Sequence, residues 1–228
     1  DRRRAPRAPA LSPARRRRGR RWRPGSCYRV RAVERFREAS ASLYAPAYGL
    51  YYRDRRFINA QSENGEKVFW SRGNGWVLAG IARVLQDLPQ DHSARPWFED
   101  RFRTMAEAVA CTQQESGFWR PSLLDAKADP QPETSGTGFF TYALAWGINA
   151  GLISETTYGP VVARAWKGMV HQAVNKKGRV GWTQRPGDRP ALVEEDRAEP
   201  YGAGAFLLAG SELINLLDAS GGTGAARK

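Results

Sequence analysis

Three segments of the chain repeat one pattern, and this repeat constrains the fold more than any other feature. They read SRGNGWVLAGIARVL, TSGTGFFTYALAWGI and PYGAGAFLLAGSELI, and they begin at Ser71, Thr134 and Pro200. Each contains Gly-x-Gly followed by an apolar run typical of a helix without a polar face. A helix that is apolar all round is buried on all sides. The sequence therefore predicts three buried inner helices, whose first glycines are Gly73, Gly136 and Gly202.

Amphipathic segments between the repeats predict a second layer of helices. Residues 94–113 and 158–174 place apolar residues at helical spacing among charged ones, which is typical of a helix with one buried face. A glycine and a short aromatic-rich strand follow each of them, at 117–124 and 178–184, and residues 49–57 resemble a third such strand. The predicted unit is an inner helix, an outer helix, a glycine turn, a strand and a loop.

Stacked units of this kind bury a shared core. The simplest all-α architecture for them is an α/α toroid, a helical barrel in which outer helices surround inner ones. An open α-solenoid is the alternative, although solenoid repeats usually run only about 33–47 residues, whereas the glycines here recur after 63 and 66 residues. About three helix-pair repeats are visible, so we expect an incomplete toroid.

Charge divides the chain into two parts. Residues 1–37 hold 15 Arg and two acidic residues, so they carry the whole formal charge of +13, and residues 38–228 are neutral overall. The first part has too few apolar side chains to offset the entropy cost of folding. We expect an Arg-rich tail at 1–37, either disordered or an artefact of translating GC-rich DNA, and the toroid domain at 38–228. A nucleic-acid-binding arm is the alternative for such a tail, but the neutral domain indicates no nucleic-acid partner.

Composition excludes several classes of protein. Cys27, Cys111, His92 and His171 are the only cysteines and histidines, and their spacing fits neither a structural metal site nor a disulfide framework. No apolar run approaches the length of a membrane span. The sequence therefore predicts a cytoplasmic protein with no metal and no membrane partner, and it leaves the oligomeric state open.

Aromatic and cationic residues cluster at the entrance of the first inner helix. Trp70, Arg72 and Trp76 flank its glycines, and alignment of the repeats puts Ser135 and Tyr201 in register with Arg72. In a toroid these entrances converge on the mouth, beside free helix N–H groups that attract anions. An Arg between two aromatic rings can stack and still offer its planar fork to a carboxylate. We predict that these five residues bind a polar, negatively charged small ligand.

Other interpretations of these residues stay open. Tryptophans more often pack in the core than contact a ligand. The Gly-x-Gly element lacks the pattern of a phosphate-binding loop. Asp54 and Glu133 occupy strand-end or loop-to-helix positions that would face the mouth, and glycoside chemistry needs at least one acid poised to protonate. Both are candidate catalytic acids, with a surface or capping role as the alternative for each.

The segments FWSRGNGWVLAGIARVLQDLP, FWRPSLLD, PETSGTGFFTYALAWGINAGL and PYGAGAFLLAGSEL together resemble glycoside hydrolase families 105 and 88, the unsaturated rhamnogalacturonyl and glucuronyl hydrolases. The resemblance runs from about Tyr44 to Leu217 and implies an (α/α)6 toroid with no cofactor. It implies release of a terminal 4,5-unsaturated uronic acid from pectin-derived oligosaccharides, in which an aspartic acid protonates the double bond and water adds. Trp70, Arg72 and Trp76 match the family's Trp-x-Arg-Gly-x-x-Trp motif, which holds the substrate near its carboxylate.

The chain also departs from the family pattern. Six helix pairs need about twice the matched length, and no segment corresponds to the Asp-x-x-Phe-Met-like motif that carries the family's catalytic Asp. The family often has a His where this chain reads Tyr52, Arg53 and Asp54, so Asp54 is at most a local substitute. We expect the C-terminal part of a hydrolase, inactive on its own. A non-catalytic carbohydrate-binding toroid, or a nucleic-acid-binding protein acting through the tail, is the alternative.

Overall fold

The computed structural model describes the backbone of residues 24–222 and the side chains of residues 29–218. The described part is helical, with one small antiparallel sheet in which Tyr44 pairs with Tyr51 and Ala45 with Leu50. The elements in chain order are α1 (Pro24–Leu43), β1 (Tyr44–Ala45), β2 (Leu50–Tyr51), the 3-10 helix η1 (Arg55–Phe57), α2 (Ser71–Asp87), α3 (Arg95–Ala110), α4 (Thr134–Asn149), α5 (Glu155–Gly168), the π-helix η2 (Met169–Ala173) and α6 (Pro200–Gly222).

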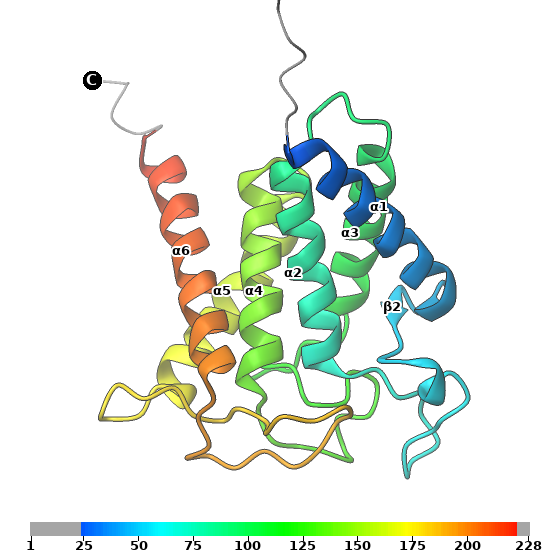
Figure 1. Cartoon of the computed structure of the whole chain (residues 1–228). Coiled ribbons are helices and arrows are strands. Elements are labelled where there is room, and N and C mark those ends of the chain that lie inside the picture. The colour runs from blue at the N-terminus through cyan, green and yellow to red at the C-terminus, as the bar shows by residue number, and fades with distance from the viewer. Residues whose placement is uncertain (1–23, 223–228) are drawn as a thin grey trace, which may run out of the picture.

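Three helices form an inner row. α2, α4 and α6 stand in this order with their N-terminal ends at the same end of the molecule, where the long loops gather (Figure 1). α4 occupies the middle of the row and packs against both of the others. α3 packs against α2 and α5 against α4, as an outer layer. The predicted inner and outer helices are thereby confirmed.

Burial differs between the middle and the ends of this row. Every residue of α4 from Thr134 to Ile148 is buried. The expectation of a helix buried all round is therefore confirmed for α4, but it is wrong for α2 and α6. On α2 the side chain of Trp76 is 54% exposed, and on α6 that of Leu207 is 69% exposed. The reason is position, because α4 has an inner helix on each side whereas α2 and α6 end the row.

The Gly-x-Gly motifs allow the inner helices to approach one another closely at their loop ends. A β-carbon on Gly136 of α4 would lie 2.7 Å from the Ser71 Oγ of α2. A β-carbon on Gly138 would lie 2.8 Å from the β-carbon of Ala205 on α6. Side chains at either position would push the helices apart, so helix packing explains Gly136 and Gly138.

The predicted short strands form only in part. Leu50–Tyr51 is a strand, whereas the other two predicted segments hold isolated bridges only, which corrects the expectation of three strands. These segments instead run beneath the inner helices and supply acceptors to the first helical N–H groups. The Ser71 N–H donates to the Pro121 carbonyl at 2.9 Å, and the Thr134 N–H donates to the Trp182 carbonyl at 2.8 Å. Helix N–H groups that lack an intrahelical partner are satisfied in this way.

The N-terminal helix α1 moves the domain boundary. Residues 24–37, which we expected within a disordered tail, are helical, so the expected boundary between 37 and 38 falls inside α1. Val33 is buried, and the Phe36 ring lies 5.3 Å from that of Phe98 on α3. These contacts join α1 to the helical domain (Figure 1). Residues 1–23 lie outside the described residues. Within the described part, no helix has both the length and the apolar character needed to cross a membrane.

Candidate active site

Arg72 lies in the first turn of α2, stacked between two aromatic rings. Its guanidinium carbon is 4.4 Å from the centroid of Trp70 and 4.7 Å from that of Tyr201. The side chain is 4% exposed, and its two terminal nitrogens donate to the carbonyls of Gln184 (2.6 Å) and Arg185 (2.8 Å). The stacking expected from the sequence is present, but the second ring belongs to Tyr201 rather than Trp76. The guanidinium therefore holds the loop that begins at Gln184.

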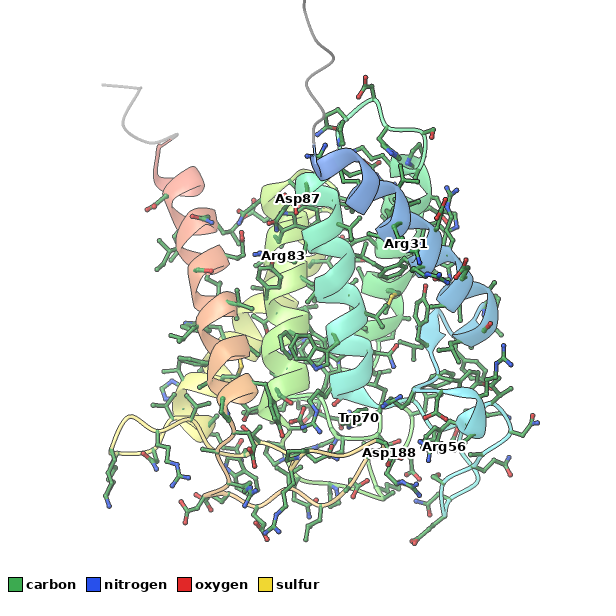
Figure 2. All side chains as sticks on the ribbon, viewed as in Figure 1. Arg31, Arg56, Trp70, Arg83, Asp87 and Asp188 are labelled. Carbon is green, nitrogen blue, oxygen red and sulfur yellow. The ribbon has the colours of Figure 1, made fainter. Side chains whose placement is uncertain are left out.

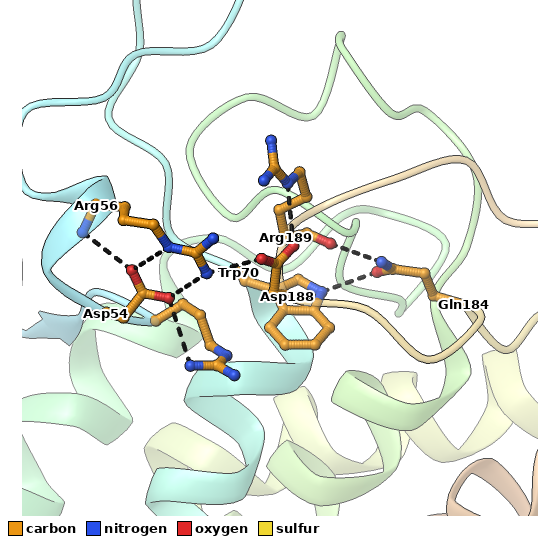
Figure 3. A network of polar contacts seen from close by, with 7 residues as sticks. Asp54, Arg56, Trp70, Gln184, Asp188 and Arg189 are labelled. Atoms are coloured by element: carbon orange, nitrogen blue, oxygen red, sulfur yellow. Dashed lines mark hydrogen bonds and ion pairs between the residues drawn. The ribbon is translucent and has the colours of Figure 1, made fainter.

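Gln184 is the centre of this arrangement. Its side-chain carbonyl accepts from Trp70 Nε1 at 2.8 Å, and its amide nitrogen donates to the Arg189 carbonyl at 2.7 Å (Figure 3). Its backbone carbonyl accepts from the Tyr201 hydroxyl at 2.6 Å as well as from Arg72. Burial raises the pKa of the Tyr201 hydroxyl, which stays protonated as a donor at neutral pH.

Sequence reasoning missed Gln184. The available signal was its place two residues after the aromatic of the 178–184 segment, but a polar residue there has no pattern that marks it. Trp182, in the same segment, has a positive φ of 50° and a buried indole N–H without a partner among the described residues. Strained backbone of this kind costs energy and is kept where neighbouring structure enforces it. The loop below the helix entrances is thus held in one defined conformation.

Glu133 is a buried cap of α4. It is fully buried, and its carboxylate accepts from the backbone N–H groups of Ser135 (3.2 Å), Gly136 (2.6 Å) and Gln184 (3.3 Å). The Ser135 hydroxyl donates to the same carboxylate at 2.6 Å and is itself buried. An acidic side chain at a helix N-terminus is stabilised by these N–H groups. Glu133 and Ser135 therefore contact each other and the loop, and both side chains are turned away from solvent.

Asp54 belongs to an exposed network of ion pairs. It caps η1 by accepting from the Arg56 N–H at 3.0 Å, and the Arg56 guanidinium donates to both of its oxygens at 2.9 and 2.8 Å. Arg56 also reaches Asp188 at 2.7 Å, so it links two loops below the inner helices (Figures 2 and 3). The hydrogen bonds from Arg56 lower the pKa of Asp54 to about 2. Asp54 is ionised at neutral pH and cannot donate a proton there.

Trp76 stands apart from the Trp70 stack. It lies one and a half turns into α2, and its ring packs on Phe139 of α4 with 4.2 Å between centroids. Trp76 is 54% exposed, so a large part of its ring on α2 is open to solvent. Trp70, by contrast, is 6% exposed. Among the residues predicted to bind substrate, Trp76 is the one whose side chain is exposed.

A polar cleft of about 440 Å³ lies beside the same loops. Its walls include Glu63, Ser122, Asp129 and Arg189. The Ser122 hydroxyl is buried there without a hydrogen-bond partner among the described residues. Burial, together with the nearby carboxylates of Asp125 and Glu63, raises the pKa of Asp129. Sequence analysis did not single out this carboxyl, because its environment comes from loops far apart in the chain. No group of three or more metal-ligating side chains occurs in the described part of the chain.

An inner row of helices backed by an outer layer, with the long loops gathered at one end, defines a fold of the α/α-toroid class. Residues 24–217 match the model of Glycosyl Hydrolase Family 88, and the chain belongs to that family. It is 41% identical over 179 residues to an unsaturated 3S-rhamnoglycuronyl hydrolase of Alteromonas sp. (strain LOR), covering 78% of this chain and 43% of that protein.

Solved structures agree with this assignment. A glycosyl hydrolase family 88 protein from Bacteroides vulgatus is 39% identical with a TM-score of 0.76, covering 78% of this chain and 53% of that one. A possible member of family 105 from Salmonella enterica serovar Paratyphi A shares the fold, with 23% identity and a TM-score of 0.69, covering 86% of this chain and 51% of that one. The expected fold class and family resemblance are confirmed. The chain spans about half the length of these relatives.

Proposed function

We propose that this chain forms the sugar-holding part of a hydrolase site that releases a terminal 4,5-unsaturated uronic acid by hydration of the double bond. The class of activity is supported by membership of family 88 and by the unsaturated rhamnoglycuronyl hydrolase named above. A rhamnogalacturonan-derived oligosaccharide from pectin is the first candidate substrate. An unsaturated rhamnoglycuronyl oligosaccharide is the second, because that is what the name of the Alteromonas relative describes.

The exposed ring of Trp76 is the observation that carries the proposal. An indole that is open to solvent and fixed from behind by Phe139 presents a flat apolar surface near the loop end of the row. Aromatic faces of this kind combine large apolar area with a defined orientation, which suits the apolar face of a sugar ring. Binding of the uronate carboxylate by Arg72 stays a prediction, because the guanidinium here bonds two carbonyls.

Catalysis needs a proton donor, and the two carboxylates chosen from the sequence are poorly placed for it. Asp54 is ionised and paired with Arg56, and Glu133 accepts four hydrogen bonds as a buried cap. A general acid must hold its proton near the working pH and reach the reacting atom. We therefore propose that the chain binds the sugar but turns it over slowly. This arrangement favours the alternative of a carbohydrate-binding protein without catalysis.

Titration calorimetry with one unsaturated disaccharide from each candidate class, rhamnogalacturonan-derived and rhamnoglycuronyl, tests the binding role. Loss of the ultraviolet absorbance of the conjugated double bond tests turnover. Trp76→Ala is expected to weaken binding roughly tenfold, or about 1.4 kcal/mol, while the melting temperature stays near that of the parent chain. Leu192→Ala is the control, because Leu192 is also an exposed apolar residue, at 65%, but lies in the 184–194 loop. Absence of sugar binding by the parent chain, or equal affinity of Trp76→Ala, would contradict the proposal.

If turnover is observed, three carboxylate variants identify the acid. Asp129→Asn is then expected to reduce the rate most, because Asp129 combines a raised pKa with a place in the polar cleft. Asp54→Asn and Glu133→Gln serve as comparisons.

A role in nucleic-acid binding, acting through the tail, is the least favoured function; deletion of residues 1–23 would abolish nucleic-acid binding if it exists, since the basic residues of such an arm supply the affinity.

A further inference from the structure

Arg120 differs from every other arginine that the described part of the fold buries in full or in part. It lies in the segment between α3 and α4, and its side chain is partly buried. It makes no hydrogen bond, ion pair or ring contact with another described residue. The other arginines of this part that are not exposed all bond to oxygens or stack on rings, namely Arg72, Arg95, Arg101 and Arg197.

The guanidinium of Arg120 is open to a ligand. Its nitrogens are not among the buried polar atoms that lack a partner in the described part of the chain, so they keep contact with solvent. Burial lowers the pKa of this guanidinium, and no neighbouring carboxylate offsets the effect. Partial burial of a charge costs free energy unless a partner compensates for it. The planar guanidinium matches two oxygens of a carboxylate or sulfate group, so the environment of Arg120 suits an oxyanion.

The backbone on both sides of Arg120 is held in place. Trp119 is fully buried, and its indole N–H donates to the Val109 carbonyl at 2.8 Å. On the other side, the Pro121 carbonyl accepts from the Ser71 N–H at 2.9 Å. A side chain on a fixed backbone loses less freedom when it binds a ligand, which favours affinity.

Arg120 belongs to the same helix entrance as Arg72. The residue before Arg72 donates its N–H to the carbonyl of the residue after Arg120, and this segment runs at the loop end of the molecule (Figure 1). Arg72 uses both of its terminal nitrogens on carbonyls of the loop that begins at Gln184. Of the two arginines, Arg120 is therefore the one whose donors are available.

We propose that Arg120 binds an oxyanion group of an acidic oligosaccharide, either a uronate carboxylate or a sulfate ester. The exposed arginines of the neighbouring loops are poorer candidates, because each already pairs with a carboxylate: Arg53, Arg56, Arg185 and Arg189. The nature of the oligosaccharide rests on the proposed function. The anion site itself rests on the surroundings of Arg120.

Inorganic sulfate tests the anion site without any sugar. The Nε–Hε resonance of Arg120 is identified by NMR from its absence in Arg120→Gln, and sodium sulfate then replaces sodium chloride at constant ionic strength. We expect a saturable shift of this resonance. Arg83 is the matched control, because it is exposed on α2, likewise has no partner among the described residues, and lies away from the loop end (Figure 2). Its resonance should show no saturation.

Calorimetry then identifies the group that the site holds on a sugar. The ligands are an unsaturated rhamnoglycuronyl disaccharide and the same disaccharide with a sulfate ester on its rhamnose. Arg120→Gln is expected to weaken binding about tenfold or more, as for the loss of a charge-assisted hydrogen bond. An equal loss for both ligands assigns the uronate carboxylate, and a loss for the sulfated ligand alone assigns the sulfate ester. Arg83→Gln should bind both ligands like the parent chain, and both variants should keep the parent melting temperature.

Two results would overturn the inference. One is a sulfate titration in which Arg120 and Arg83 respond alike, since this would reduce Arg120 to an ordinary surface charge. The other is sugar binding by the parent chain that Arg120→Gln leaves unchanged for both ligands, which would remove the assignment to an acidic sugar. Failure of the parent chain to bind either sugar would contradict the proposed function instead, and the sulfate titration would still decide whether Arg120 is an anion site.

Discussion

Two polar regions lie at the loop end of the molecule, and each contains one of the carboxylates that the sequence offered as an acid. Glu133 sits at the α4 entrance, fully buried, and accepts from neutral N–H and O–H groups. Asp54 sits in an exposed loop, with its side chain 26% exposed, and is held by arginines. Both carboxylates have hydrogen-bond partners, but those of Glu133 are neutral groups and those of Asp54 are charged arginines.

The difference teaches which contacts stabilise the fold. When a buried acceptor is removed, its donors are left without a partner and out of reach of water. Hydrogen bonds to such an acceptor therefore contribute strongly to the free energy of unfolding. An exposed ion pair exchanges its partner for water and ions at little cost, and such pairs contribute about 0–1 kcal/mol. We therefore expect the buried contacts of Glu133 at the α4 entrance to contribute more to the stability of the domain than the Asp54 network, which should influence only the position of a loop.

Glu133→Ala should give the largest effect in this comparison. Removal of the carboxylate leaves the N–H groups of Ser135 and Gly136 and the Ser135 hydroxyl unsatisfied in a buried site. We expect a loss of about 3 kcal/mol in the free energy of unfolding, from a lost cap and buried donors. Urea unfolding followed by circular dichroism measures it. Glu133→Gln keeps one acceptor and should lose clearly less, and equal losses for the two variants would show that the hydrogen bonds contribute little.

Arg72→Ala should rank next. It removes the stack between Trp70 and Tyr201 and leaves the carbonyls of Gln184 and Arg185 without their donor. We expect a loss of about 2 kcal/mol in the free energy of unfolding. Arg72→Lys should restore little of it, because an ammonium group cannot stack as a plane or donate to two carbonyls in a fork. Full recovery by Lys would reduce the role of Arg72 to that of a point charge.

Close packing of the entrance predicts opposite effects for two glycines. Gly138→Ala places a methyl group against Ala205 of the neighbouring inner helix and should cost about 1–2 kcal/mol of unfolding free energy by overpacking. Gly204 has no atom within 4 Å of an added β-carbon. Gly204→Ala should therefore stabilise α6 by about 0.5–1 kcal/mol through helix propensity. Thermal unfolding of both variants checks the pair, and destabilisation by both would show that backbone freedom, not helix packing, explains the glycines.

The helices were predictable from the sequence because their signals are local. Gly-x-Gly followed by an apolar run located α2, α4 and α6, and amphipathic spacing located α3 and α5. The start of α1 at Pro24 was not predictable in this way, because the few buried side chains of this helix are surrounded in the sequence by arginines. The packing of Phe36 on α3 stabilises a segment whose composition favours disorder.

The site was predictable only as a cluster, not as a geometry. Arg72 was expected to stack between aromatics, but nothing local shows that Tyr201, 129 residues later in the chain, supplies the second ring. The position of Gln184 two residues after Trp182 was not enough to mark it, because its importance lies in partners from three separate segments. The occupied state of Asp54 and Glu133 depends on loop placement in the same way. Residue types indicated the chemistry, and long-range contacts decided which groups are free.

Asp54→Asn should have the smallest effect, and one visible only through its dependence on pH. The pKa of Asp54 in the folded chain is about 2, below its ordinary value of 3.8, because Arg56 donates to the carboxylate. A group with a lowered pKa stabilises the fold above its unfolded-state pKa and loses this contribution as pH falls through the folded value. The parent chain should therefore lose stability between about pH 4 and pH 2 relative to the Asn variant.

Arg56→Gln should reduce the same pH dependence, and added salt should diminish it because the pair is exposed. Unfolding curves of the three proteins at pH 7, 4 and 2.5 measure the difference. If Asp54→Asn destabilises the chain as much as Glu133→Ala at pH 7, the division into a buried stabilising entrance and an exposed loop network is wrong.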